Sequence, residues 1–130
     1  MKKHSITIDK IICNSDSEIG YDEVYLKCQS DAGLTFRLPR NRYESESMSN
    51  GDTWVPMVTG ANGIKKPLTL YFYFEVLVTL WDKDETRLPG NDTYLQSYDF
   101  RPGSGSGSVT LSNLNGQSYT IEYTYGKKNI

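Results

Sequence analysis

Aspartates concentrate in two short polar segments of the sequence. Asp16 and Asp22 lie in the first segment, and Asp82, Asp84 and Asp92 lie in the second. Carboxylates gathered at one place repel one another strongly unless a cation lies among them. Oxygen ligands without histidine or cysteine favour Ca²⁺, which accepts about six to eight oxygens in irregular geometry. If the two segments meet in space, these five side chains therefore predict a calcium site.

An EF-hand does not explain the second acidic segment. Counted from Asp82, the sixth position is Arg87, where this loop needs a glycine. The twelfth position is Thr93, where the loop needs a glutamate. For either segment alone, an ordinary solvated loop stays open as the alternative, because turns favour aspartate.

Composition argues against several other kinds of site. A net charge of −2 does not suit a nucleic-acid binder, which normally carries a basic stripe. The chain has a single histidine, His4, and no Cys-x-x-Cys spacing, so we expect neither a zinc site nor histidine-based nucleophilic catalysis. We therefore expect a binding module and not an enzyme. For Cys13 and Cys28, a disulfide and two small buried hydrophobic residues both remain open.

The pattern of apolar residues predicts strands and no helix. In the first strand Ile6, Ile8 and Ile12 share one face by alternation. The run 68–81 alternates throughout, which places Phe74 on the same face as Leu68 and Leu80. It is longer than most strands, so we expect a bend near Phe74 or two strands in sequence. The strands are expected at 5–13, 23–29, 34–38, 53–59, 68–81, 93–100, 109–114 and 117–125.

The connections complete the expected fold. Residues 39–52 read as a long loop, 60–67 as a turn and 101–108 as a flexible connection. About eight short strands predict an all-β fold, a two-sheet antiparallel β-sandwich, with residues 1–130 as a single domain. Because loops at one end of a sandwich converge, this fold would let the two acidic segments meet.

No segment of the sequence suits a membrane-spanning helix. No apolar run reaches the length of roughly 18 to 20 residues that a bilayer requires, and the best candidate carries Glu75 in its middle. The basic N-terminus is not followed by an apolar region, so we expect no signal peptide. A cytoplasmic or peripheral membrane location is expected, and secretion stays open.

Both acidic segments resemble those of C2 domains. "DSEIGYDEVYLK" is similar to the first calcium-binding loop of the family and the strand after it, and "LWDKDETRLPGNDTYLQS" is similar to the third loop. The order of strands and acidic loops along the chain fits the family as well. The sequence departs from the family pattern at Glu23, which replaces a proline, and at Gln96, which replaces a glycine.

The resemblance implies a C2-like β-sandwich that binds calcium and an anionic phospholipid membrane. It places the five aspartates at the ligand positions of the two loops. It also implies membrane contact by apolar side chains near the loop tips, for which the candidates are Ile19, Tyr21, Leu88 and Pro89.

Other functions remain open at this point. A basic patch could contact an anionic membrane, although scattered solubilising charge explains the same residues, which are Arg37, Arg40, Arg42, Lys65 and Lys66. A protein-binding or carbohydrate-binding adhesion module, in which calcium is structural or absent, is the main alternative. A structural subunit that pairs through edge strands such as 53–59 is a further one.

Overall fold

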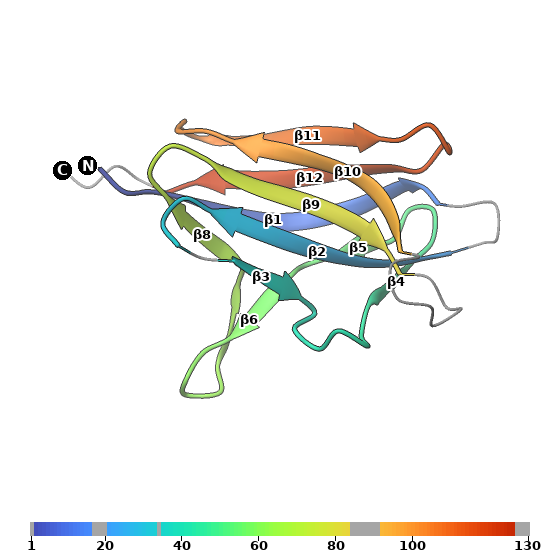
Figure 1. Cartoon of the computed structure of the whole chain (residues 1–130), viewed down its shortest axis with the longest axis horizontal. Helices are drawn as coiled ribbons and strands as arrows, with labels where there is room; N and C mark the ends of the chain where they lie inside the picture. The colour runs from blue at the N-terminus through green and yellow to red at the C-terminus, as the bar shows by residue number, and fades with distance from the viewer. Residues whose placement is uncertain (1, 17–20, 34, 84–91, 127–130) are drawn as a thin grey trace.

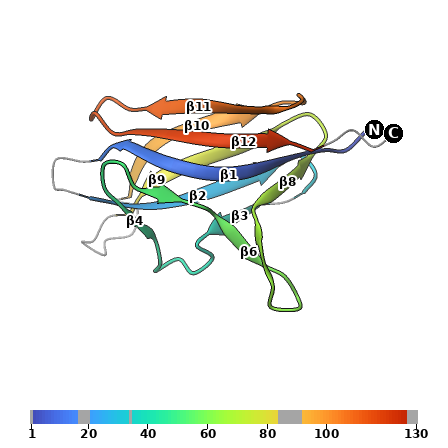
Figure 2. The ribbon, with the colours of Figure 1, turned by 180° about the vertical axis from the view of Figure 1, so that it is seen from behind.

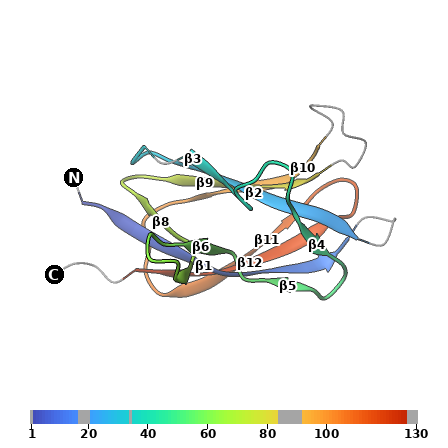
Figure 3. The ribbon, with the colours of Figure 1, turned by 90° about the horizontal axis from the view of Figure 1, so that it is seen from below.

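The chain folds as a sandwich of two antiparallel β-sheets. The structure, a computed structural model, describes residues 2–16, 21–33, 35–83 and 92–126. These residues form strands and no helix (Figure 1), so the described part of the chain holds no helix that could cross a membrane. Seen from below, the two sheets lie as separate layers (Figure 3). The all-β class and the sandwich predicted from the sequence are confirmed.

Each sheet has five strands. The first sheet has the order β11-β12-β1-β5, with β8 also paired to β1, and the second has the order β10-β9-β2-β3, with β4 also paired to β2. The first contains β1 (His4–Ser15), β5 (Thr53–Trp54), β8 (Thr69–Phe72), β11 (Ser106–Ser112) and β12 (Ser118–Tyr125). The second contains β2 (Asp22–Ser30), β3 (Thr35–Leu38), β4 (Glu46–Met48), β9 (Val76–Asp82) and β10 (Thr93–Phe100).

A small hairpin projects from the body of the sandwich. Strands β6 (Met57–Thr59) and β7 (Lys65–Pro67) pair only with each other among the described residues, and Figure 2 shows them pointing away from both sheets. The strand expected at 53–59 is therefore two strands, interrupted at Val55 and Pro56, because proline cannot donate to a sheet. The turn expected at 60–67 is in part a strand.

The core lies between the two sheets, as the alternation predicts. Its largest fully buried side chains include Tyr119, Phe72, Phe100, Ile6, Leu26 and Ile121. Cys13 and Cys28 are buried there as free thiols, so the disulfide left open by the sequence is absent. Burial raises the pKa of the Cys28 thiol to about 12, which makes this group an inert part of the core.

A β-bulge changes the face of the first strand halfway along. Ile6 and Ile8 are buried, but the pairing of β1 with β12 shifts register between Ile8 and Lys10. After this shift Ile11 is buried and Ile12 is only half-buried. The expectation that Ile12 shares the inner face is wrong, because the extra residue of a bulge exchanges the two faces.

The long apolar run 68–81 is divided between the two sheets. Strand β8 pairs with β1, and β9 pairs with β2 and β10. The expected break therefore occurs at Tyr73–Glu75, and Phe74 is 64% exposed in the connection. The assignment of Phe74 to the same face as Leu68 and Leu80 is wrong, because the chain turns there.

Two other expected loops contain strands. β4 lies within the predicted loop 39–52, where its three residues pair with the start of β2. β11 begins at Ser106, inside the predicted flexible connection 101–108, because it pairs along its length with β12. Tertiary pairing overrides the weak strand propensity of glycine and serine at these positions.

Candidate functional site

The ends of β1, β9 and β11 lie at one end of the sandwich. Ser15, at the end of β1, pairs with Ser118 at the start of β12. Asp82, at the end of β9, lies opposite Val24 of β2 and Thr93 of β10. The connections after β1, β9 and β11 therefore share this end, which we call the carboxylate end after Asp82 and its neighbour Asp22.

Asp22 and Asp82 lie on either side of one amide group. The side-chain Nε2 of Gln117 donates to Asp22 Oδ1 at 3.1 Å and to Asp82 Oδ2 at 3.2 Å. The Tyr119 hydroxyl donates to Asp22 Oδ2, and the backbone N–H of Glu23 donates to Asp82 Oδ1 at 2.9 Å. Asp22 is fully buried. Two acidic segments far apart in sequence thus converge on one point.

The electrostatics of this point disfavour two negative charges. Burial raises the pKa of the Asp82 carboxyl to about 6, and the nearby charge of Asp22 raises it as well. The N–H groups of Glu23 and Gln117 act in the opposite direction and lower it. A cation close to both carboxylates would favour their ionised forms.

The other predicted calcium ligands are less closely gathered. The backbone N–H of Asp16 donates to Asn50 Oδ1 at 2.7 Å, and Asp92 Oδ2 accepts a hydrogen bond from the Tyr25 hydroxyl. Asp84 lies outside the described residues. Within the described ranges, no group of three or more His, Cys, Asp or Glu side chains is placed to hold a metal ion.

The Asp22–Asp82 pair nevertheless fits the chemistry of a hard cation. Both side chains offer carboxylate oxygens, which Ca²⁺ prefers over nitrogen and sulfur. One oxygen of each reaches the same donor, Nε2 of Gln117, within 3.2 Å. The pair therefore fits two ligands of a calcium site, with the positive end of an amide dipole between them in the structure.

Only one of the predicted membrane contacts can be placed. Tyr21 comes directly before β2 at the carboxylate end and is 43% exposed. Ile19, Leu88 and Pro89 lie outside the described residues.

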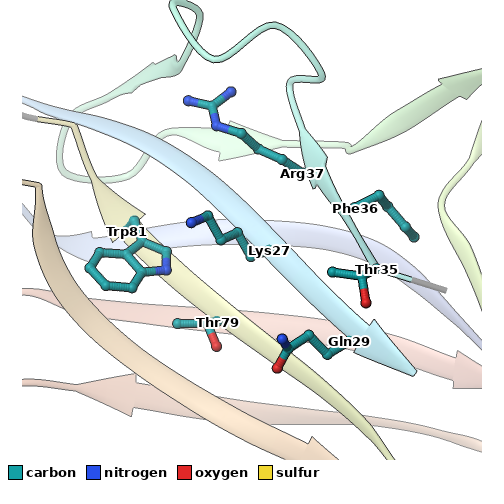
Figure 4. A pocket seen from close by; sticks show the side chains of 7 residues that line it. All are labelled: Lys27, Gln29, Thr35, Phe36, Arg37, Thr79 and Trp81. Carbon is teal, nitrogen blue, oxygen red and sulfur yellow. The ribbon is translucent and has the colours of Figure 1, made fainter. Parts of the chain in front are cut away.

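A pocket opens on the outer face of the second sheet. It has a volume of about 450 Å³ and lies over β2, β3 and β9 (Figure 4). The Lys27 ammonium lies 5.6 Å from the centre of the Trp81 ring. The Trp81 Nε1 is buried and has no hydrogen-bond partner among the described residues. The lining residues are Lys27, Gln29, Thr35, Phe36, Arg37, Thr79 and Trp81.

Arg37 lines this pocket, but its guanidinium holds the neighbouring loop. It donates to four backbone carbonyl groups within residues 39–44, at 2.5 to 3.3 Å. Its guanidinium carbon lies 4.0 Å from the centre of the Tyr25 ring. Arg37 therefore orders loop 39–44, and Lys27 is the lysine that lines the pocket.

The predicted basic patch is distributed over different elements. Arg40 and Arg42 are exposed on loop 39–44, whereas Lys65 and Lys66 are exposed on β7 of the projecting hairpin. A joint contact of these residues with an anionic membrane stays a prediction.

Sequence reasoning missed Gln117 and Tyr119, whose side chains donate hydrogen bonds to Asp22. Gln117 follows the Asn-Gly turn, and Tyr119 belongs to the tyrosine-rich last strand. The sequence predicts both within a strand at 117–125, whereas β12 begins at Ser118 and Gln117 lies just before it. Both residues are buried at the carboxylate end, next to Asp22. The sequence alone does not show this position, because it depends on how the two sheets pack.

Comparisons with known proteins identify the fold. A solved structure described as a C2 domain is similar to this chain with a TM-score of 0.53 and 11% identity, covering 98% of this chain and 100% of that one. A C2 domain of a plant extended synaptotagmin 1 is similar with a TM-score of 0.47 and 7% identity, covering 99% and 97%. No family model matches the sequence, and no curated protein does. The chain thus has a divergent C2-like fold, as the resemblance of its acidic segments predicted.

Proposed function

We propose that this chain is a calcium-binding module, without enzymatic activity, that engages anionic phospholipid membranes through its carboxylate end. We further propose that residues 1–130 fold as a single domain. The observation that carries the proposal is the convergence of Asp22, at the start of β2, and Asp82, at the end of β9, on a single point next to Gln117 Nε2.

The ligands proposed for calcium are the five aspartates that the sequence indicated. Asp22 and Asp82 would form the centre, and Asp16, Asp84 and Asp92 would complete the oxygen set. Bound calcium supplies positive charge and coordination positions that accept phosphate oxygens of lipid headgroups. Tyr119 and Gln117 hold Asp22 in place before any ion binds, since both donate hydrogen bonds to it.

Charge supports a role for the cation in membrane binding. The chain carries a net charge of −2, and two of its carboxylates converge at the end that would face the membrane. Like charges repel, so an acidic end approaches an anionic surface poorly. A cation between the carboxylates would remove this repulsion.

Vesicle sedimentation tests the proposal. The wild-type protein should sediment with phosphatidylserine-containing vesicles in millimolar Ca²⁺ but not in EDTA or Mg²⁺. Asp82→Asn should abolish this binding, because it removes a charged ligand from the central pair. Glu122→Gln is the matched control, since Glu122 lies on the first sheet and pairs with Lys10 at 3.7 Å. Equal binding in Ca²⁺ and EDTA would refute the calcium dependence.

Thermal unfolding gives an independent readout of the ion. Ca²⁺ at about a hundred times its dissociation constant should stabilise the folded state by roughly 2.7 kcal/mol. Asp82→Asn should lose this stabilisation and Glu122→Gln should keep it. If calcium stabilises the protein and no vesicle binds, calcium is structural, and a glycan array then tests the alternative of a carbohydrate-binding module.

The pocket on the second sheet supports a second candidate function, calcium-independent binding of an anionic group. Lys27 is exposed and supplies a positive charge next to the Trp81 ring. Figure 4 shows both side chains lining the pocket. Vesicle binding that persists in EDTA and weakens in Lys27→Ala, but not in Lys10→Ala, would support it.

A further inference from the structure

The turn between β11 and β12 presents a fully exposed leucine. Leu114 has a relative exposure of 105%, the highest of the large hydrophobic residues described. It lies in the connection between Ser112 and Ser118, so it belongs to the carboxylate end. Single exposed apolar residues are common on protein surfaces, and exposure alone does not assign it a role.

The turn is held rigidly by its own side chains. Asn113 Oδ1 accepts from the backbone N–H groups of Asn115 and Gln117, both at 3.1 Å. The backbone N–H of Asn113 donates to the carbonyl of Gln117 at 3.0 Å, and Gly116, with a φ of 83°, takes the left-handed conformation that glycine favours. Leu114 is therefore displayed by a fixed turn.

Gln117 ties this turn to the carboxylate pair. Its Oε1 accepts from Asn113 Nδ2 at 2.9 Å, while its Nε2 donates to Asp22 and Asp82. One side chain thus spans the distance between the proposed calcium ligands and the turn that carries Leu114. A surface that lies against the carboxylate end therefore also lies next to this turn.

The sequence around Leu114 is uncharged, whereas charged residues directly follow the exposed Ile64 and Phe74. Residues 102–121 contain no Asp, Glu, Lys or Arg. By contrast, Ile64 precedes two lysines and Phe74 precedes Glu75. Entry of a charged group into an apolar region costs far more free energy than entry of a satisfied polar turn. This turn can therefore enter the boundary of a bilayer at low cost.

We propose that the β11–β12 turn is a membrane-contacting element and that Leu114 is the side chain that inserts into the apolar boundary of an anionic bilayer. The inference rests on the proposed membrane function and adds a contact outside the two acidic loops. The partner is a lipid surface, because the carboxylate pair beside the turn needs a cation to meet anionic headgroups, and the turn itself brings no charge.

Site-specific labelling tests the insertion directly. Leu114→Cys is labelled with an environment-sensitive fluorophore, and Phe74→Cys, in the connection after β8, is the matched control. Cys13 and Cys28 are 0% and 1% exposed, so they should not react in the folded protein. With phosphatidylserine-containing vesicles in Ca²⁺, the label at position 114 should shift to shorter emission wavelengths and be quenched by bilayer-embedded quenchers. The label at position 74 should not change.

Binding measurements give the second readout. Leu114→Asn should weaken vesicle binding about tenfold, as expected from loss of a partly buried leucine. Ile64→Asn should change it less than about twofold. Vesicle binding with no response at position 114 and no loss in Leu114→Asn would overturn this inference and leave the proposed function intact. No binding of the wild-type protein to any vesicle would overturn both.

Discussion

Strand β2 has an aspartate at each end, and the two side chains have opposite environments. Asp22 begins the strand, is fully buried and accepts from the side chains of Gln117 and Tyr119. Asp31 follows the last residue of the strand and accepts from the backbone N–H groups of Tyr73, Phe74 and Glu75, at 2.6 to 3.0 Å. The same residue type thus serves two ends of one sandwich in different ways.

At the Asp31 end the carboxylate closes a turn. Its three backbone donors belong to the connection that carries the chain from β8 in the first sheet to β9 in the second. Desolvation acts to raise the pKa of Asp31, but the hydrogen bonds from this connection outweigh it and hold the pKa below its usual value. The negative charge is therefore satisfied by the chain itself.

At the carboxylate end a second acidic group changes the electrostatics. Asp22 faces another carboxyl group, Asp82, and burial raises the pKa of Asp82 to about 6. The comparison teaches that the number of aspartates does not identify a cation site. The informative feature is a second carboxylate that converges on the same point from another strand.

Of the substitutions at the two ends of β2, removal of the Asp22 side chain is expected to change the free energy of unfolding most. Asp22→Ala leaves the buried Tyr119 hydroxyl and the Gln117 amide without an acceptor that both now use. Each such loss typically costs about 1 to 3 kcal/mol, so we expect a decrease of about 3 kcal/mol in the free energy of unfolding without metal. Urea denaturation in EDTA measures it.

Asp16→Ala is the matched control for this prediction. Asp16 is another proposed ligand, and its hydrogen bond to Asn50 uses the backbone N–H and not the carboxylate. Its removal should therefore leave the metal-free free energy of unfolding nearly unchanged. A similar decrease in the free energy of unfolding in both variants would contradict the prediction that the hydrogen bonds of Asp22 stabilise the folded state.

The next effect concerns the pH dependence of stability in EDTA. The folded protein holds the Asp82 proton up to about pH 6, whereas the unfolded chain releases it near the ordinary pKa of 3.8. Between these values the folded state binds more protons, so this group's contribution to stability falls as pH rises and is lost above pH 6. The wild-type free energy of unfolding, compared with that of Asp82→Asn from pH 4 to 8, measures this contribution. A difference that is constant with pH would contradict it.

Much of the fold was predictable from local sequence. Alternation in the first strand identified Ile6 and Ile8 correctly as residues of the inner face, because burial on one side of a strand selects apolar residues at every second position. The length of the run 68–81 predicted its division into two strands. The position of Ile12 was not predictable, because a bulge depends on the partner strand and leaves the composition of its own strand unchanged.

The candidate site was predictable only in part. Asp22 and Asp82 are identifiable because acidic residues beside apolar strands are visible in the sequence. Gln117 lies 95 positions from Asp22, and nothing local to a glutamine after a turn shows that it faces two carboxylates. The sequence predicted a loop at 39–44 but not its order, since Arg37 holds it through backbone carbonyl groups, which carry no sequence signal.

A smaller effect than that of Asp22→Ala is expected from Asp31→Ala, and its pH dependence should have the opposite sign to that of Asp82. Because the pKa of Asp31 is lowered in the folded protein, its stabilising contribution is present above the ordinary pKa of 3.8 and is lost as pH falls through the folded value. Solvent screens this exposed group, so the loss at pH 7 should be smaller than for Asp22→Ala. Asp31→Ala should also keep the full stabilisation by Ca²⁺, because its carboxylate lies at the other end of β2. If stabilisation by Ca²⁺ disappeared in this variant, the ion would bind at the Asp31 end and not at the carboxylate end. The contrast between the two aspartates of β2 would then no longer identify the cation site.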